Sequence, residues 1–459
     1  MSGAIYRVRG IFMGSNEKNL RLLNLAWPIF MQQLLSMFLG YADTIMMSHY
    51  SDIAVGALGN ANQITGFLIL AFSVITSATG VVVSQYLGAG KTEEMNKIYS
   101  VALMFNFFIS IFVSLLISVF ASPLLRFIKI PNVMMKDAVQ YMQVTGCFLF
   151  SNALIQVFAE IFNCNGKTLY GMIIMFAMNI LNIAGNYIFL CGPLAYLNMG
   201  TAGVGISTSA SRLICLVACI VIFKKQIGGK FSFSYFKPFP KELLAKLVKI
   251  GVPAAGEGFS YNVSLIIISV FVNTLGPIAI TARVYCNILC GFSTIFSNSI
   301  ASATAIITGH AVGAGREDYA YKKVLNSLLW AVIITAGISF TNFAISRWTL
   351  SLFTKNAEII ELGHRVMFVA FCLELGRVVN YVVIRSMRAA GDIVFPVVLG
   401  ICSMWIISIG LAWLLGIHFK LGLVGIWCGM AADEIFRGVV VFIRWIMGSW
   451  RGRKIVAEK

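Results

Sequence analysis

The chain has 459 residues, of which 59% are hydrophobic and only 12% are charged. A soluble protein carries about 25% charged residues, so this composition excludes a soluble globular protein. The long continuous apolar runs also exclude an outer-membrane barrel, whose strands alternate polar and apolar residues. The net charge is +17. Most of the basic residues lie in segments on one side of the predicted spans, so they indicate membrane topology and do not predict a nucleic-acid partner. The sequence therefore predicts an all-α polytopic membrane protein.

Twelve apolar runs are each close to the ~20 residues that a helix needs to cross a bilayer. We predict transmembrane helices at residues 22–48, 58–80, 98–121, 136–163, 168–191, 203–223, 246–273, 284–308, 324–346, 363–388, 394–416 and 422–446. The first of them carries Asp43. A carboxylate at membrane depth costs roughly 2.5–3.5 kcal/mol on insertion scales and usually faces a partner or a water-filled cavity. Asp43 is therefore the first candidate functional residue.

Lysine and arginine are unevenly divided between the two sides of these spans. If the N-terminus is inside, the inner segments hold 24 of the 35 basic residues, the outer loops hold eight, and three lie within spans. Arg7, Arg9 and Lys18 belong to the inner set. The positive-inside rule then predicts that both termini are cytoplasmic in a multi-pass protein of the inner or plasma membrane. No cleavable signal is expected, because residues 15–19 are polar and interrupt the basic start before the first apolar run.

Matching residues recur at one constant offset. Pro28 in the first span corresponds to Pro253 in the seventh, 225 residues later, and residues 88–91 (Gly-Ala-Gly-Lys) correspond to residues 313–316 (Gly-Ala-Gly-Arg) at the same offset. This repeat predicts two parallel six-helix halves around a central cleft, the architecture of alternating-access transporters. We expect an N-terminal lobe at residues 1–223, a cytoplasmic linker at 224–245 and a C-terminal lobe at 246–459.

Four polar residues of the first half are predicted to reach the same depth. From a rise of ~1.5 Å per residue, Asp43, Asn182, Asn186 and Thr208 all fall in the outer half of the membrane. A carboxylate with amide and hydroxyl oxygens suits Na⁺, whereas the carboxylate alone suits H⁺. The alternative is that the asparagines and the threonine only stabilise helix contacts. The sequence favours a cation-coupling site, with no metal expected beyond possible Na⁺ at Asp43.

The second half carries acidic residues on different spans. Glu257, the repeat counterpart of Gln32, and Glu374 both fall near mid-membrane by residue count, so these three residues are candidates for a substrate cavity or for coupling in the second lobe. For Glu374, an ion pair with Arg377 at i,i+3 is equally compatible with the sequence. Asp433 and Arg437 stand at i,i+4 on the last span, where a structural ion pair is the favoured interpretation.

The chain resembles the multidrug and toxic compound extrusion (MATE) family over essentially its full length. The resemblance depends on the order and spacing of several motifs rather than on any one of them. These are Pro28 with residues 41–44 (Tyr-Ala-Asp-Thr), residues 84–90 (Ser-Gln-Tyr-Leu-Gly-Ala-Gly), the turns at 163–168 and 388–392, residues 182–186 with 202–208, and the last span from Asp433 to Trp450.

This resemblance implies a secondary antiporter that exports amphiphilic, often cationic organic compounds in exchange for H⁺ or Na⁺. Family members place a cation site in the first lobe, at positions that match Asp43, Asn182, Asn186 and Thr208. Some relatives carry aspartate where this chain has Asn186, so the site here has one carboxylate instead of two. That difference leaves the coupling ion open. Glu257 and Glu374 each fall about one helical turn from the acidic positions that are usual in the family.

Two other functions are compatible with parts of the sequence. A flippase for lipid-linked saccharides would share the fold, but its cavity tends to carry several basic residues, and only Arg212, Arg377 and Arg437 lie within predicted spans here. An enzyme is not expected, because no metalloprotease, prenyl-diphosphate or nucleophile-elbow motif is present. The expected partners are small organic substrates and the lipid bilayer. We expect no cofactor apart from the coupling ion, and no obligatory protein partner.

Overall fold

The structure is a computed structural model that describes residues 20–128 and 130–456, apart from the side chains of Asp52, Leu70 and Ala71. The predicted inner residues Arg7, Arg9 and Lys18 lie outside the described residues. Every regular element in the described part of the chain is helical. The prediction of an all-α protein is therefore confirmed.

The elements follow the predicted spans closely. The first half contains α2 (Leu22–Ser48), α3 (Asp52–Gly88), α4 (Thr92–Phe127), α5 (Asn132–Cys147), α6 (Leu149–Cys164), α7 (Thr168–Leu190), η1 (Ala195–Leu197), α8 (Gly200–Ile222), η2 (Phe223–Ile227) and η3 (Phe233–Phe236). The second contains α9 (Lys241–Asn273), α10 (Pro277–Gly313), α11 (Glu317–Ala344), α12 (Ser346–Ser351), α13 (Ala357–Ala390), α14 (Val394–Ser403), η4 (Met404–Ile409), α15 (Gly410–Trp413), η5 (Leu414–His418) and α16 (Gly422–Ile446). Most helices extend beyond their apolar stretch by several residues, because hydrogen bonding continues where hydropathy falls.

Among the described residues, nine helices are long and apolar enough to cross a membrane, or eleven if each of two bent helix pairs counts as one span. The helix α16 has 25 residues, which is also long enough to cross. It is not among the nine because it carries four charged residues, Asp433, Glu434, Arg437 and Arg444, and is therefore less apolar than the others. With α16 included, the elements account for all twelve predicted spans.

One predicted span, residues 136–163, is two helices instead of one. The helices α5 and α6 are bent by 48° at Phe148, whose backbone leaves the helical region. Polar side chains satisfy the backbone groups that the bend frees: the Ser114 hydroxyl accepts a hydrogen bond from the Phe150 N–H at 3.0 Å, and the Ser151 hydroxyl donates to the Phe148 carbonyl at 2.6 Å. Such local replacement makes a broken helix tolerable in lipid.

The chain forms two compact units. The N-terminal unit comprises the residues up to Val83 and Lys91–Gly251, and the C-terminal unit comprises Ser84–Gly90 and the residues from Val252 onward. Segment 224–245, the expected linker, contacts α4 of the N-terminal unit. The Lys230 N–H donates to the Asn96 side chain at 2.8 Å, and the Ser232 N–H donates to the Ser100 hydroxyl at 3.4 Å.

The predicted repeat is visible in the turns. Gly90 ends the turn after α3 and Gly315 ends the turn after α10, with φ values of 71° and 72°. Each N–H bonds back to the carbonyl three residues earlier, at 3.1 and 3.0 Å. Glycine populates this left-handed region at no steric cost, so both halves use the same residue for the same turn.

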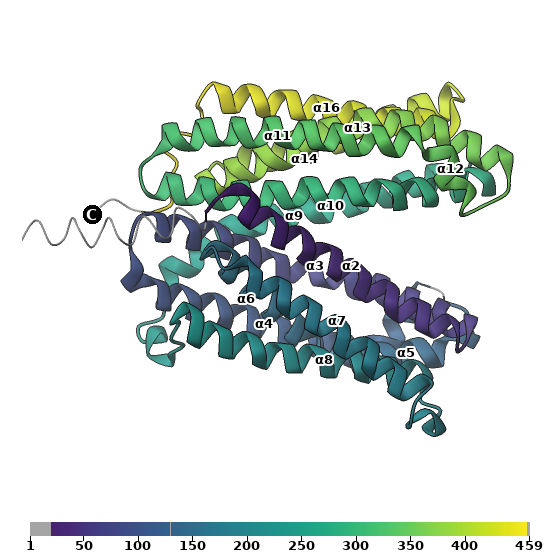
Figure 1. The fold of residues 1–459 in the computed structure, drawn as a ribbon, viewed down its shortest axis with the longest axis horizontal. Helices are drawn as coiled ribbons and strands as arrows, with labels where there is room; N and C mark the ends of the chain where they lie inside the picture. Colours follow the sequence, from purple (N-terminus) through teal and green to yellow (C-terminus); the bar gives the residue numbers. More distant parts are fainter. Residues whose placement is uncertain (1–19, 129, 457–459) are drawn as a thin grey trace, which may run out of the picture. The chain divides into compact units, whose positions relative to one another are not determined.

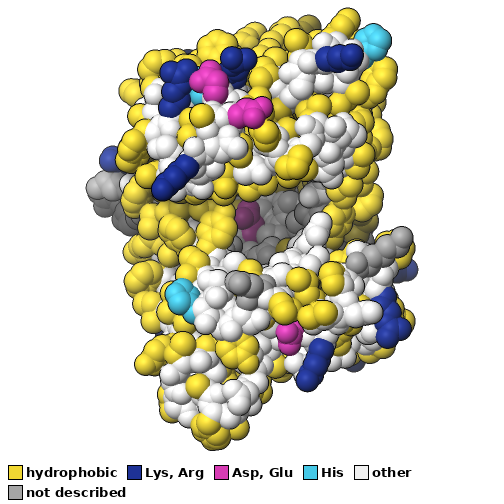
Figure 2. Space-filling view, turned by 90° about the vertical axis from the view of Figure 1, so that its right-hand side faces the viewer, with side chains coloured by type: hydrophobic (Ala, Val, Ile, Leu, Met, Phe, Trp, Pro, Cys, Tyr) yellow, Lys and Arg dark blue, Asp and Glu magenta, His cyan; other side chains and the backbone are white. Residues whose placement is uncertain are grey.

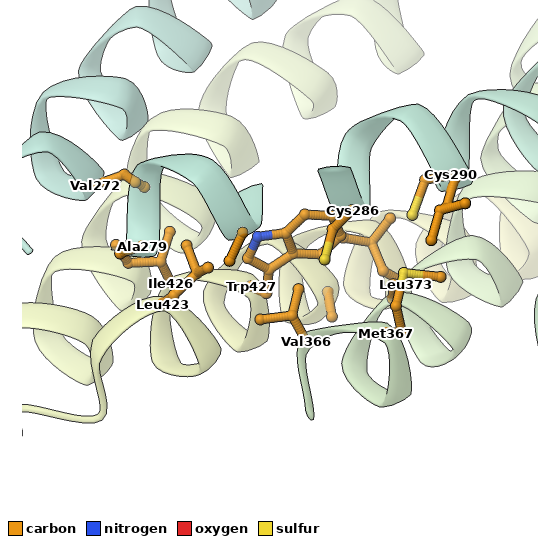
Figure 3. Packing of buried hydrophobic residues seen from close by; sticks show 14 of the residues in the cluster. Val272, Ala279, Cys286, Cys290, Val366, Met367, Leu373, Leu423, Ile426 and Trp427 are labelled. Atoms are coloured by element: carbon orange, nitrogen blue, oxygen red, sulfur yellow. The ribbon is translucent and has the colours of Figure 1, made fainter. Parts of the chain in front are cut away.

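Each unit has its own apolar core. In the C-terminal unit, α10, α11, α13 and α16 run side by side (Figure 1). Trp427 of α16 lies in the core of this unit beside Cys286 of α10 and Val366 of α13 (Figure 3). In the N-terminal unit, buried residues of α2, α3, α4, α5, α6 and α8 form a cluster, with Phe72 among them. Figure 2 shows hydrophobic side chains over much of the surface and few charged ones, as a protein solvated by lipid requires.

Candidate ion-coupling site

Three helices of the N-terminal unit bring the predicted site residues together. The helix α2 carries Asp43, α7 carries Asn182 and Asn186 on one face, and α8 carries Thr208. The helices α7 and α8 approach closely because Gly185 has no side chain, and a Cβ at that position would lie 2.2 Å from the Ser207 hydroxyl. Small residues at helix contacts are typical of membrane proteins.

The four side chains form one hydrogen-bonded cluster. Asn186 Nδ2 donates to Asp43 Oδ1 at 2.7 Å, and the Thr208 hydroxyl donates to Asp43 Oδ2 at 3.3 Å. Asn182 Nδ2 donates to Thr208 Oγ1 at 3.1 Å, and Asn186 Nδ2 also lies 3.4 Å from Asn182 Oδ1. Each carboxylate oxygen of Asp43 therefore has a donor, one from α7 and one from α8. One acidic side chain links three helices.

The cluster is buried. Asp43 is 4% exposed, Thr208 is 1% exposed, and both asparagines are fully buried. A buried carboxylate is stable only when hydrogen bonds or charges compensate for its lost hydration, and these donors supply that compensation. Asn186 Oδ1 is itself buried without a hydrogen-bond partner among the described residues. An acceptor in that position is available to a cation or a donor.

A basic residue lies next to the cluster, and the sequence did not assign it to the site. Arg212 stands one turn after Thr208 on α8, and its Nε is buried without a hydrogen-bond partner among the described residues. Tyr141 of α5 donates its hydroxyl hydrogen to Asn62 Oδ1 at 3.2 Å. The i,i+4 spacing of Thr208 and Arg212 was the available sequence signal, because it places both side chains on one helix face.

Gln32 is buried and hydrogen-bonded within the N-terminal unit. Its side chain is 8% exposed and donates to Asn163 Oδ1 at 3.2 Å and to the Thr168 carbonyl at 2.9 Å. Gly171 of α7 packs against it so closely that a Cβ there would lie 2.8 Å from the amide nitrogen. Gln32 therefore joins α2 to the turn between α6 and α7, and its assignment to a substrate cavity stays a prediction.

In the C-terminal unit, Glu374 belongs to a buried charge network. Arg377 Nη1 pairs with Glu374 Oε1 on the same helix, and Arg377 Nε lies 3.5 Å from Glu434 of α16. The Thr294 hydroxyl of α10 donates to Glu374 Oε1 at 3.4 Å. Glu374 Oε2 is buried with no hydrogen-bond partner in the described part of the chain. Glu374 is thus ion-paired and still holds one unused acceptor.

The last span extends the same network. Arg437 Nη2 lies 3.0 Å from Asp433 Oδ2 and 3.1 Å from Glu434 Oε2. Asn380 of α13 donates to Glu434 Oε2 at 2.7 Å. The pair of Asp433 and Arg437 is therefore part of a larger network between α13 and α16. The network contains three acidic residues, Glu374, Asp433 and Glu434, and two basic ones, Arg377 and Arg437. Sequence reasoning missed the central position of Glu434, because it bridges both arginines only through the packing of two helices.

Glu257 contacts a different part of α13 from the part that carries Glu374. It forms an ion pair with Arg388, in the last turn of α13, whereas Glu374 lies 14 residues earlier on that helix. At a rise of ~1.5 Å per residue, that separation is ~21 Å along the axis. The expectation that both acids lie near mid-membrane stays a prediction, and Glu257 stands at the middle of α9, 16 residues from each end of the helix.

A bundle of membrane-spanning helices in two repeats, with buried acidic residues linking helices inside each repeat, defines a secondary-transporter architecture. The sequence profile of the MatE family matches residues 28–188 and again residues 253–414, which is one match in each repeat and an offset of 225 between the starting positions. The chain belongs to the MatE family of multidrug and toxic compound extrusion transporters.

Relatives of the chain cover nearly its whole length. An uncharacterized transporter of Bacillus subtilis, YisQ, is 40% identical over 434 residues, which is 95% of each chain. A probable multidrug resistance protein, NorM, of Thermotoga maritima is 23% identical and covers 95% of this chain and 94% of its own length. The Vibrio cholerae MATE transporter VcmN, in its bent form, aligns with a TM-score of 0.84 at 16% identity, over 96% of this chain and 99% of that one. The predicted family and fold are confirmed.

Proposed function

We propose that the protein is a secondary active antiporter that exports amphiphilic, often cationic organic compounds in exchange for entering H⁺ or Na⁺. The observation that supports this proposal is the position of Asp43, a buried carboxylate whose two oxygens accept hydrogen bonds from two different helices. A residue so costly to bury within a membrane indicates a functional role.

Coupling follows from the same contacts. A cation on Asp43 competes with the donors Asn186 and Thr208 for the carboxylate oxygens. Its binding therefore changes the hydrogen bonds that join α2 to α7 and α8. An ion can shift a conformational equilibrium only by its differential affinity for the two states, and a site shared by three helices provides such a difference. Export by alternating access would use this change to lower substrate affinity when the ion binds.

The proposed substrate class relies on chemistry and on the family. Several relatives carry the name probable multidrug resistance protein. The chain itself contains 20 methionines and 13% aromatic residues. Methionine side chains adapt to ligands of different shape, which suits export of chemically varied apolar compounds. A flippase for lipid-linked saccharides is less well supported, because two of the three arginines named above, Arg377 and Arg437, are paired with carboxylates and so are not free for pyrophosphate.

Membrane orientation is part of the proposal, with both termini cytoplasmic in the cell membrane. In this orientation Cys191, an exposed residue after α7, faces outside, and Lys322, an exposed residue on the first turns of α11, faces inside. A cysteine-free variant would be given either Cys191 alone or Lys322→Cys alone. A membrane-impermeant maleimide added to intact cells should label only the first. If only the Lys322→Cys protein were labelled, the orientation would be the opposite of the one proposed.

Ethidium efflux from loaded cells tests the role of Asp43. The variant Asp43→Asn removes the charge and keeps the shape, and we expect efflux to fall to the level of cells without the transporter. Asp137→Asn, a change of the same kind at the beginning of α5, is the matched control and should keep full activity. Unimpaired efflux by Asp43→Asn at normal abundance would remove Asp43 from the mechanism.

The driving ion is tested with purified protein in proteoliposomes. A Na⁺ gradient and a pH gradient are imposed separately, and substrate movement is followed in each case. Antiport requires a response to at least one gradient. No response to either would contradict the proposed function as a whole.

A further inference from the structure

Three helices of the C-terminal unit form an apolar groove that the proposed antiport does not use. The helix α13 packs against both α11 and α16, and residues of all three line the groove (Figure 1). Its volume is about 650 Å³, within the range of about 300–1,000 Å³ that is typical of ligand sites. The lining is almost entirely hydrophobic. The groove therefore has the size and the surface of a site for an apolar group.

Two glycines shape the groove where α13 meets α16. A Cβ on Gly376 would lie 2.8 Å from the backbone of Glu434, and a Cβ on Gly438 would lie 3.3 Å from the carbonyl oxygen of Gly376. The two helices therefore pack backbone to backbone, and no side chain from these positions fills the space above the contact. Glycine is typical of such helix contacts in membranes. An empty apolar space loses van der Waals contacts, so an apolar group that enters it is stabilised.

The groove is about as long as one leaflet of the bilayer. Its lining residues fall within 325–332 on α11, 372–379 on α13 and 435–442 on α16. At a rise of ~1.5 Å per residue, each stretch is ~10 Å long, and Val332 lies ~15 Å along α11 from Lys322. The hydrocarbon core of a bilayer is ~30 Å thick, so ~15 Å is the depth of one leaflet. A single lipid acyl chain has this reach.

Lys322 lies at one end of the groove. It precedes the lining residues Leu325 and Leu329 by three and seven positions, which is the spacing of one helix face. Its side chain is exposed and forms no ion pair among the described residues, and Asp318, one turn earlier, pairs instead with Arg451 at 2.8 Å. A lysine ammonium binds phosphate as a point charge, and basic residues at the membrane surface attract anionic lipids.

We propose that this groove binds an acyl chain of an anionic phospholipid, with the phosphate of the headgroup at Lys322. The length of the groove matches the chain, and the charge at its end matches the headgroup. A cationic organic compound is not the occupant we assign, because Lys322 would repel it. The proposal requires only that the chain crosses a membrane, so it is independent of the proposed antiport.

Photo-crosslinking in vesicles tests the proposal. The full chain is reconstituted in phosphatidylcholine vesicles that contain a trace of phosphatidylglycerol with a diazirine in the middle of one acyl chain. A parallel sample contains a phosphatidylcholine probe with the same chains. After illumination, mass spectrometry should find the adducts of the anionic probe within residues 325–332, 372–379 and 435–442, at about five times the yield of the zwitterionic probe. Lys322→Gln should lower the anionic yield about fivefold, which corresponds to about 1 kcal/mol for one basic residue at the surface.

Matched variants separate the charge of the site from its shape. Lys323→Gln removes the same charge one position further, about 100° around the helix, and should leave the yield unchanged. Val439→Trp places a larger side chain in the groove and should remove the adducts. Ile333→Trp should keep them, because Ile333 does not line the groove although it is as exposed as Val439, at 51% and 52%. If Val439→Trp does not fold, Leu329→Trp on α11 takes its place.

Several outcomes would overturn the proposal. Equal yields from the two probes, or an anionic yield that Lys322→Gln leaves unchanged, would mean that the groove contacts surrounding lipid without selecting it. Displacement of the anionic probe by ethidium would make the groove a substrate site instead. Absence of adducts from the groove would mean that another occupant, such as a second copy of the chain, covers it. Efflux is not measured in this experiment, so none of these results bears on the role of Asp43.

Discussion

Asn186 Nδ2 donates a hydrogen bond to Asp43 Oδ1 at 2.7 Å, while Oδ1 of the same amide is buried without a partner in the described part of the chain. The amide therefore uses its donor side and leaves its acceptor side unused. A positive ion on Asp43 would favour the opposite orientation, because carbonyl oxygens coordinate cations and N–H groups do not. The orientation of Asn186 in this structure is therefore the one that suits a negatively charged Asp43.

Replacement of Asn186 by alanine should impair export. The variant Asn186→Ala leaves Asp43 Oδ1 without its closest donor, and a hydrogen bond to a charged group is worth about 1.5–3 kcal/mol. We expect lower thermal stability in detergent and a large loss of ethidium efflux at normal abundance.

Asn179→Ala is the matched control, because Asn179 lies on the same helix and donates to the Leu35 carbonyl of α2 at 3.1 Å, away from Asp43. That variant should lose stability and retain efflux per molecule. Equal losses of efflux in the two variants would mean that Asn186 only joins helices.

Sequence reasoning located the spans and the depth of the Asp43 cluster, and the physical reason is simple. Apolar length and helix rise are both one-dimensional, so they predicted α2 at its observed bounds and brought Asp43, Asn186 and Thr208 to one level. The depth of a residue along its helix does not say in which direction around the helix axis its side chain points. Depth could therefore not predict that Gln32 bonds to Asn163 or that Glu257 pairs with an arginine of α13.

The position of Glu434 between two arginines allows a second test. Arg377 and Arg437 both contact its carboxylate, and Asn380 donates to it as well. Glu434→Gln should lower the free energy of unfolding by roughly 3 kcal/mol. This is the lower end of the range for a broken buried pair, because each arginine keeps a second carboxylate.

Chemical or thermal unfolding of the purified protein measures this effect. Glu361→Gln is the control, since Glu361 pairs with Arg347 at 3.0 Å on an exposed surface, where salt bridges contribute little. We expect no measurable change in that variant. A Glu434→Gln protein as stable as wild type would show that the network between α13 and α16 does not stabilise the fold.

Gly313 of α10 is a position where the backbone of α3 comes very close within the C-terminal unit. A Cβ there would lie 2.0 Å from the carbonyl oxygen of Gln85, and backbone atoms cannot move aside as a side chain can. Gly313→Ala should therefore destabilise the unit by about 1–3 kcal/mol or more, as overpacking does. Gly337→Ala on α11 is the matched control: nothing lies within 4 Å of its Cβ position, and alanine should raise helix stability by up to about 1 kcal/mol. Opposite signs in the two unfolding midpoints are the expected result.

The segment after α16 is held by Trp450. Its ring stacks on Trp445 with centroids 4.2 Å apart and planes inclined by 8°, and its Nε1 donates to the Trp445 carbonyl at 3.1 Å. Beyond it, the Ile455 N–H donates to Gln85 Oε1 at 2.8 Å, so the same segment reaches the end of α3 within the C-terminal unit.

Removal of the Trp450 side chain should release this segment. Trp450 is fully buried, and replacement of a buried tryptophan by alanine costs about 3–5 kcal/mol. We expect Trp450→Ala to lower the unfolding midpoint and to make the bonds after Arg451, Arg453 and Lys454 cleavable by trypsin at rates well above those of wild type. Trp348→Ala is the control, because Trp348 is 64% exposed and should change neither measurement. Equal cleavage rates for wild type and Trp450→Ala would mean that the hydrogen bond to Gln85 and the ion pair of Arg453 with Asp392, at 2.9 Å, hold the segment without the stacked rings.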